Sequence, residues 1–354
     1  MEISIISSTI KSIFVVNNSK EIDHAISISR IVAMIFIVLC HTGNHFNNAI
    51  VSQLFNLGVP IFFVISGSLY AKKSIDNPKD WLIKRVIRLY MPLIAWTLFY
   101  IVRLICEKSL SWTTNDVVSV ILLLTNLQGL QHFFTSFMSV DGPWFFTIIM
   151  FCYIVLIPLK KCEKIKQEAT NKGNISKIVA LFTLTVLAYF IHVDLTGFFY
   201  FFFGYYITQC GFNKKGSNIR IYAVLILLFL SLCLRLIFKL YFDETWYYNG
   251  LIVPLTHVIA AFSIVLFFKA VRNINNIVFD SIACKSVFHW LDSISVYVYC
   301  FHGVFITGTF SVFSFGISSA IEIVILFVCV FILSTIVAVI FESIGNYLLS
   351  RIVN

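Results

Sequence analysis

The sequence predicts an all-α, polytopic integral membrane protein with about ten transmembrane helices and both termini in the cytosol. Three observations predict this class. Of 354 residues, 59% are hydrophobic and only 12% are charged, whereas soluble domains carry roughly 25% charged residues. The mean hydropathy is +0.91. Apolar runs long enough to cross about 30 Å of hydrocarbon recur along the chain. A surface of this composition suits lipid rather than water.

Ten apolar segments reach the length of about 20 residues that a spanning helix needs. In chain order they are 27–46, 53–71, 86–105, 143–160, 177–194, 196–212, 219–240, 250–269, 289–310 and 318–341. An eleventh candidate, 117–139, is apolar only up to Leu124 and then turns polar at Thr125, Asn126 and Gln128.

Positive charges decide whether the eleventh segment crosses. With ten spans and a cytosolic N-terminus, 22 of the 26 Lys and Arg residues fall on the cytosolic side. The outer four are Arg103, Lys108, Arg235 and Lys239. A crossing at 117–139 would leave 11 inside and 15 outside. Because cytosolic loops carry the Lys/Arg excess, ten spans are favoured, and we expect 106–142 to form one extracytosolic loop with room for an interfacial helix.

This topology divides the chain into three parts. Residues 1–26 form a cytosolic N-terminal segment, 27–345 the transmembrane domain and 346–354 a cytosolic tail. The net charge of +9 then reflects the positive-inside rule, so we expect no nucleic-acid partner. We expect membrane lipids around a multi-pass protein of the plasma membrane, which is the inner membrane in a bacterium. The cysteines form no CxxC pair, no His/Asp/Glu ligand set stands out, and we expect no metal.

Ionisable side chains within a span are candidates for function because they are costly in lipid. Arg30 stands at the cytosolic end of the first span, and His41 follows eleven residues later. Eleven residues make almost three helical turns, so both side chains face one way, about 16 Å apart along the axis. Histidine near mid-membrane or slightly beyond is suited to general-base work. The alternative is a buried histidine bonded to a neighbouring carbonyl.

A second candidate is the pair Arg85 and Arg88 at the start of the third span. The two are neighbours on a helix, and Pro92 cannot donate back to the carbonyl of Arg88, which favours a kink. Two guanidinium groups at the cytosolic rim are suited to gripping phosphate. The alternative is an ordinary positive-inside anchor.

Four further residues are weaker candidates on their own. Ser66 stands beside Gly67 in the second span, where small residues usually indicate close helix packing. Trp144 opens the fourth span from outside, a common place for an interfacial tryptophan. Tyr299 and His302 lie midway along the ninth span, where a lone histidine is as readily structural as catalytic.

Taken together, these features resemble the membrane acyltransferase family often called acyltransferase 3, over about residues 25–345. The resemblance rests on five landmarks in the family's order. They are Arg30 with His41, the run Phe62 to Gly67, Arg85 and Arg88 followed by Pro92, Trp144 with Phe145, and Ser295, Tyr299 and His302. Each is weak alone, whereas five in order are specific.

The resemblance implies transfer of an acyl group, usually acetyl, from cytosolic acetyl-coenzyme A to a hydroxyl of a cell-surface or lipid-linked saccharide. It implies that His41, with Arg30, is catalytic and that Arg85 and Arg88 bind the donor. Supporting roles fall to Ser66, Trp144, Tyr299 and His302.

Two other functions stay open. A transporter, flippase or export component for a surface polysaccharide would line a pathway with Arg30 and His41, although we see no internal repeat of the kind that transporters carry. A glycan polymerase would need a large, charged extracytosolic loop, and 106–142 carries few charges.

Overall fold

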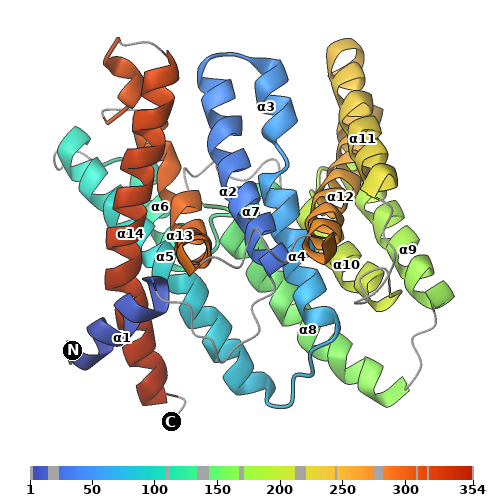
Figure 1. The fold of residues 1–354 in the computed structure, drawn as a ribbon, viewed down its shortest axis with the longest axis horizontal. Coiled ribbons are helices and arrows are strands. Elements are labelled where there is room, and N and C mark those ends of the chain that lie inside the picture. The colour runs from blue at the N-terminus through green and yellow to red at the C-terminus, as the bar shows by residue number, and fades with distance from the viewer. Residues whose placement is uncertain are drawn as a thin grey trace. The chain divides into compact units, whose positions relative to one another are not determined.

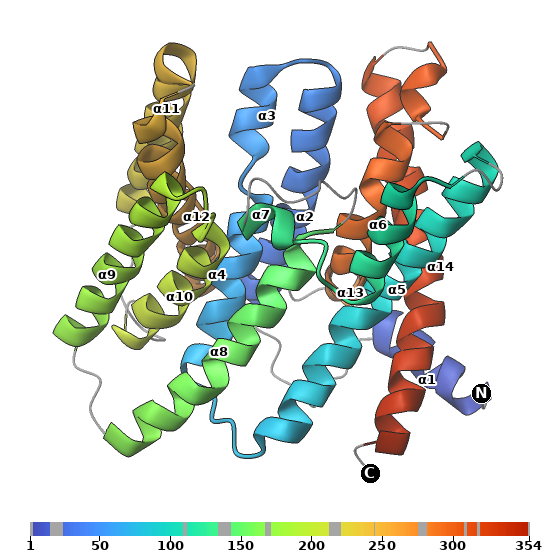
Figure 2. The same cartoon turned by 180° about the vertical axis from the view of Figure 1, so that it is seen from behind.

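A computed structural model describes residues 3–14, 24–108, 112–133, 143–166, 171–211, 221–243, 245–274, 282–307, 310–316 and 319–352 (Figures 1 and 2). The described residues form helices and no strands, which confirms the predicted all-α class. The chain forms two compact units, one of residues 1–18, 77–151 and 289–354 and the other of residues 19–76 and 152–288.

The first unit contains the two longest helices of the described chain. Its elements are α1 (Ile3–Phe14), α5 (Pro78–Lys108), α6 (Thr114–Leu124), α7 (Leu130–Phe133), the start of α8 (Phe145–Lys166), most of α13 (Ile282–Ile306), a 3₁₀ turn (Val312–Ser314) and α14 (Ser319–Ile352). α14 runs for 34 residues and packs against α5 and α1. α5 runs without a break through Pro92. The proline removes one backbone hydrogen bond of the helix, and packing against neighbouring segments keeps the helix intact.

The second unit is built around short, buried helices. Its elements are α2 (His24–His45), α3 (Ala49–Phe55), α4 (Gly58–Ala71), the rest of α8, α9 (Asn171–Phe190), α10 (Thr196–Gln209), α11 (Ile221–Phe242), a π-helical turn (Tyr248–Ile252) and α12 (Val253–Ile274). Figure 1 shows α2 and α3 as a hairpin and α11 beside α12.

Close backbone contact joins α4 to α10. A Cβ atom on Gly67 would overlap the carbonyl oxygen of Phe201, and one on Gly204 would overlap the carbonyl oxygen of Val64. Ser68 donates through Oγ to the carbonyl of Gly204 at 3.1 Å. The small-residue run of the second span therefore marks close helix packing, as the sequence indicated.

Eight helical segments of the described chain are long and apolar enough to cross a membrane, which establishes a multi-pass architecture. They correspond to eight of the ten predicted spans. The sixth, 196–212, forms the 14-residue α10, about 21 Å long at 1.5 Å per residue, and it is mostly buried in protein rather than exposed. The ninth, 289–310, overlaps α13, whose hydropathy is lowered by His289, Asp292 and Ser293. The count of ten stays a prediction.

The eleventh segment does not form one long helix. Residues 117–133 are divided between α6, of 11 residues, and α7, of four. The polar side chains that interrupted the apolar run fold back on the start of α8: Asn126 donates to the carbonyl of Phe146 at 3.2 Å and Gln128 to that of Pro143 at 3.1 Å. Residues 109–111 and 134–142 of the predicted loop lie outside the described residues.

Candidate functional site

Arg30 and His41 both lie on α2, in the second unit. The helix is continuous between them, so the eleven-residue spacing places them about 16 Å apart along its axis. Arg30 is half-buried and His41 is exposed. His41 lies four residues before the end of α2 at His45, closer to the hairpin turn than the mid-membrane position that spacing alone suggested. His41 is therefore exposed near the end of its helix rather than packed inside the second unit.

Arg85 and Arg88 lie one turn apart on α5, in the first unit. The Arg85 guanidinium lies over the ring of Trp81, with Cζ 5.9 Å from the ring centroid, and this stacking limits its orientations. Arg88 is exposed. Arg85 and Arg88 belong to the first unit, whereas Arg30 and His41 belong to the second. Each pair is aligned only by the residue spacing along its own helix.

Glu342 is a charged residue that the sequence reasoning missed. It lies on α14 and accepts a hydrogen bond from the Tyr297 hydroxyl at 3.2 Å, and it interacts electrostatically with Arg88. The last predicted span ended at 341, so Glu342 counted as a residue beyond the membrane. Because α14 continues to Ile352, the carboxylate is instead held inside a long helix. A carboxylate that directly follows a long apolar run is the signal that could have found it.

Two landmarks that are far apart in the sequence meet in the first unit. The backbone N–H of Phe145, the first residue of α8, donates to the Tyr299 hydroxyl at 3.3 Å, and the two rings meet edge to face with centroids 5.7 Å apart. Tyr299 thereby satisfies one of the N–H groups that a helix start leaves without a partner. The Trp144–Phe145 element and the Tyr299 region are thus parts of one local structure.

His302 is held by its own helix. Its Nδ1 donates to the carbonyl oxygens of Tyr299 at 2.8 Å and Val298 at 3.2 Å, which fixes the ring and leaves Nε2 without the proton in the neutral form. Ser66, in the second unit, is half-buried on α4 beside Gly67. The structure describes no bond that gives Ser66 a chemical role.

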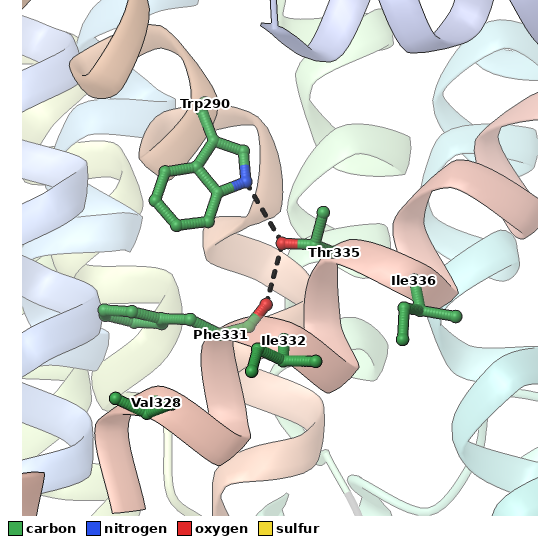
Figure 3. Close-up of a pocket in the computed structure, with 6 residues that line it drawn as sticks. All are labelled: Trp290, Val328, Phe331, Ile332, Thr335 and Ile336. Atoms are coloured by element: carbon green, nitrogen blue, oxygen red, sulfur yellow. Dashed lines mark hydrogen bonds between the residues drawn. The ribbon is translucent and has the colours of Figure 1, made fainter. Parts of the chain in front are cut away.

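A groove of about 380 Å³ lies on the first unit, lined by Trp290 of α13 and by α14 (Figure 3). The α14 residues are Val328, Phe331, Ile332, Thr335 and Ile336. Trp290 Nε1 donates to Thr335 Oγ1 at 3.0 Å, and that hydroxyl donates to the Phe331 carbonyl at 2.7 Å. The polar atoms satisfy one another, so the groove presents an apolar lining suited to a hydrocarbon chain and not to proton transfer. It contains none of the predicted site residues.

No group of three or more His, Cys, Asp or Glu side chains is placed to hold a metal ion in the described ranges.

Comparison with known proteins gives one result. A family model described as an acyltransferase domain matches residues 23–342. No curated protein and no solved structure matches the chain.

Proposed function

Because the chain belongs to this acyltransferase family, we propose that it moves an acyl group, acetyl in the first instance, from cytosolic acyl-coenzyme A to a saccharide hydroxyl. The acceptor is a cell-surface or lipid-linked glycan at the plasma membrane. The observation that carries the proposal is the family match over nearly the whole chain, and the exposed His41 on α2 supports it.

His41 acts as general base in this proposal. An imidazole nitrogen removes the proton of the acceptor hydroxyl while the hydroxyl oxygen bonds to the thioester carbonyl carbon. The carbon–sulfur bond then breaks, and the coenzyme thiolate leaves with the proton returned by the imidazolium. General-base assistance of this kind contributes about 10²–10⁴-fold to the rate. In the alternative path His41 bonds to the thioester carbonyl carbon and the coenzyme thiol leaves, and the acceptor hydroxyl then takes the acetyl group from the imidazole nitrogen and returns its proton to the freed imidazole.

Arg85 and Arg88 hold the donor's phosphate groups. The exposure of Arg88 and the stacking of Arg85 on Trp81 support this role, because a pre-oriented guanidinium loses less entropy when it binds phosphate in bidentate fashion. Glu342 interacts electrostatically with Arg88 and partly balances its charge when no donor is bound. Arg30 adds positive charge on the helix that carries His41. Ser66, Trp144, Tyr299 and His302 support the fold around these groups.

The test is label transfer by the purified protein in liposomes. With acetyl-labelled coenzyme A and an added lipid-linked saccharide, we expect label to appear on the saccharide in proportion to donor consumed. Propionyl- and succinyl-coenzyme A, offered separately, measure the acyl preference. Absence of donor consumption by folded protein with acceptor present would favour the alternative, a transport or export component for a surface polysaccharide.

Replacing Arg88 by glutamine should weaken donor binding through the phosphates. We expect KM for acetyl-coenzyme A to rise roughly 10- to 100-fold, the worth of one hydrogen bond to a charged group, with kcat little changed. The comparison donor is S-acetyl-pantetheine, which lacks the phosphates. Its KM should be the same for Arg88→Gln and the wild type.

The charge control is Lys79→Gln on the same helix. Lys79 is exposed and lies nine residues before Arg88, on the opposite face of α5, so its loss should leave both KM values near those of the wild type. Equal increases in KM for the two donors in Arg88→Gln would contradict the phosphate role.

A further inference from the structure

The second unit buries a guanidinium group that the proposed function does not use. Arg235 of α11 is 1% exposed, although most of α11 faces outward. Its Nε and Nη2 both donate to Gln53 Oε1 of α3, at 3.1 and 2.8 Å. Its Nη1 is buried and makes no hydrogen bond. No carboxylate in the described part of the chain forms an ion pair with Arg235.

Neutral polar groups surround this cation. The Tyr248 hydroxyl donates to the same Gln53 oxygen at 3.4 Å, and the Tyr200 hydroxyl lies 3.0 Å from Nδ1 of the buried His257. Arg235 interacts electrostatically with both tyrosines and with His257. We call Gln53, Tyr200, Arg235, Tyr248 and His257 the Arg235 cluster.

The cluster holds a second buried nitrogen without a partner. His257 is 6% exposed, and its Nε2 makes no hydrogen bond. When Tyr200 donates to Nδ1, Nε2 carries the ring proton and becomes a donor in need of an acceptor. The cluster therefore holds a buried cation and two buried nitrogens without a hydrogen-bond partner, Arg235 Nη1 and His257 Nε2.

If this cluster had only a structural role, it would lower the stability of the folded chain. A buried charge without a counterion is costly, and a buried donor without an acceptor costs about 1–3 kcal/mol. Arginines in lipid usually pair with other charged residues or with backbone carbonyls, whereas Arg235 bonds two of its nitrogens to the single amide oxygen of Gln53. An unsatisfied guanidinium nitrogen instead fits an oxyanion, because the fork of donors matches a carboxylate or phosphate.

We propose that the Arg235 cluster binds an anionic oxygen group, a carboxylate or a phosphate, presented from the extracytosolic side. The side follows from the predicted topology, in which Arg235 is one of four outer cations. Two sources share this chemistry: an acidic saccharide and an anionic lipid headgroup.

The cluster also connects to the candidate catalytic helix. Gln53 follows Ser52, whose Oγ lies 3.8 Å from the Sγ of Cys40, and Cys40 precedes His41. An anion on Arg235 therefore stabilises the α2–α3 hairpin next to His41. This last step rests on the proposed function, whereas anion binding itself does not.

The experiment measures the melting temperature of the purified chain in neutral detergent. The saccharide probes are octyl glucuronide and octyl glucoside, which differ in one carboxylate. The lipid probes are phosphatidylglycerol and phosphatidylcholine. We expect an anionic probe in large excess to raise Tm by roughly 3 °C or more, and its neutral or zwitterionic counterpart to have little effect. No acyl transfer is needed for this readout.

Gln53→Glu is the decisive variant because it supplies an internal carboxylate of the same shape to Arg235. We expect a higher Tm without probe and loss of the response to the anion. The control is Asn47→Asp, which adds the same charge at an exposed position of the hairpin with φ of 52°, a conformation that Asp tolerates. It should keep the wild-type response. Arg235→Gln, as a second variant, should also lose the response.

A response to octyl glucuronide identifies an acidic saccharide, and a response to phosphatidylglycerol identifies a lipid headgroup. Either response, when absent in Gln53→Glu and kept in Asn47→Asp, supports the site. No response to either anion by the folded wild-type chain, or equal responses in wild type and Gln53→Glu, would overturn it.

Discussion

Replacing His41 by alanine is expected to lower the rate of acyl transfer by about 10²–10⁴-fold, the usual contribution of a general base. The protein should remain folded in the membrane, because His41 is exposed and alanine is the best helix former. The measurement is kcat for label transfer from acetyl-coenzyme A to the added saccharide, with KM for the donor determined alongside. Since the lost interaction belongs to the transition state, kcat should fall far more than KM rises.

The matched control is His45→Ala, the same change at another exposed position of α2. It removes an imidazole from the helix end without removing the proposed base, so turnover should stay near that of the wild type. His41→Gln adds a second test, since glutamine keeps hydrogen bonding but cannot accept the proton, and it should be as inactive as the alanine variant. Wild-type turnover by folded His41→Ala would reject the mechanism.

Replacing Gly67 by leucine should prevent stable folding of the second unit. A Cβ at this position meets the backbone carbonyl of Phe201 and lies 2.9 Å from the backbone nitrogen of Tyr205. Backbone atoms cannot rotate away as a side chain does, so α4 and α10 must separate. Overpacking in a core typically costs 1–3 kcal/mol, and we expect a larger loss here. The measurement is the yield of monodisperse protein in detergent and its Tm.

Gly303→Ala is the control for the glycine substitution. Gly303 also lies in a helix, α13, but no atom lies within 4 Å of the added Cβ position. Alanine should therefore leave Tm unchanged or raise it slightly, since glycine inside a helix costs about 0.5–1 kcal/mol relative to alanine. Equal yield and Tm for Gly67→Leu and Gly303→Ala would contradict the close packing of α4 against α10.

The fold class could be read from the sequence because a membrane span is a local property. Composition and the length of each apolar run suffice to find a helix in lipid, since every backbone bond is made within the segment. The polar residues Asn126 and Gln128 marked where the apolar run of 117–139 ends, and the Lys/Arg distribution favoured leaving that segment out of the count of spans. The length of α10 could not be read in this way, because an apolar run buried against α4 looks like one that faces lipid.

The candidate site likewise combines features that the sequence specifies locally with features that depend on tertiary packing. The spacing of Arg30 and His41 and the adjacency of Arg85 and Arg88 are helix periodicities, so the sequence places each pair on one face. Its motifs also carried the resemblance to the acyltransferase family, which the family match confirms. The roles of the individual residues stay predictions.

By itself, the sequence determined the all-α membrane class, the family and the landmarks on single helices, since these depend on residues close together in the chain. Only the tertiary structure decided that His41 is exposed near the end of α2, that Glu342 interacts with Arg88, and that Arg235 is buried against Gln53. Those contacts join residues 182 positions apart in the case of Gln53 and Arg235. Their formation depends on which helix faces pack together, and no local pattern of residues specifies that choice.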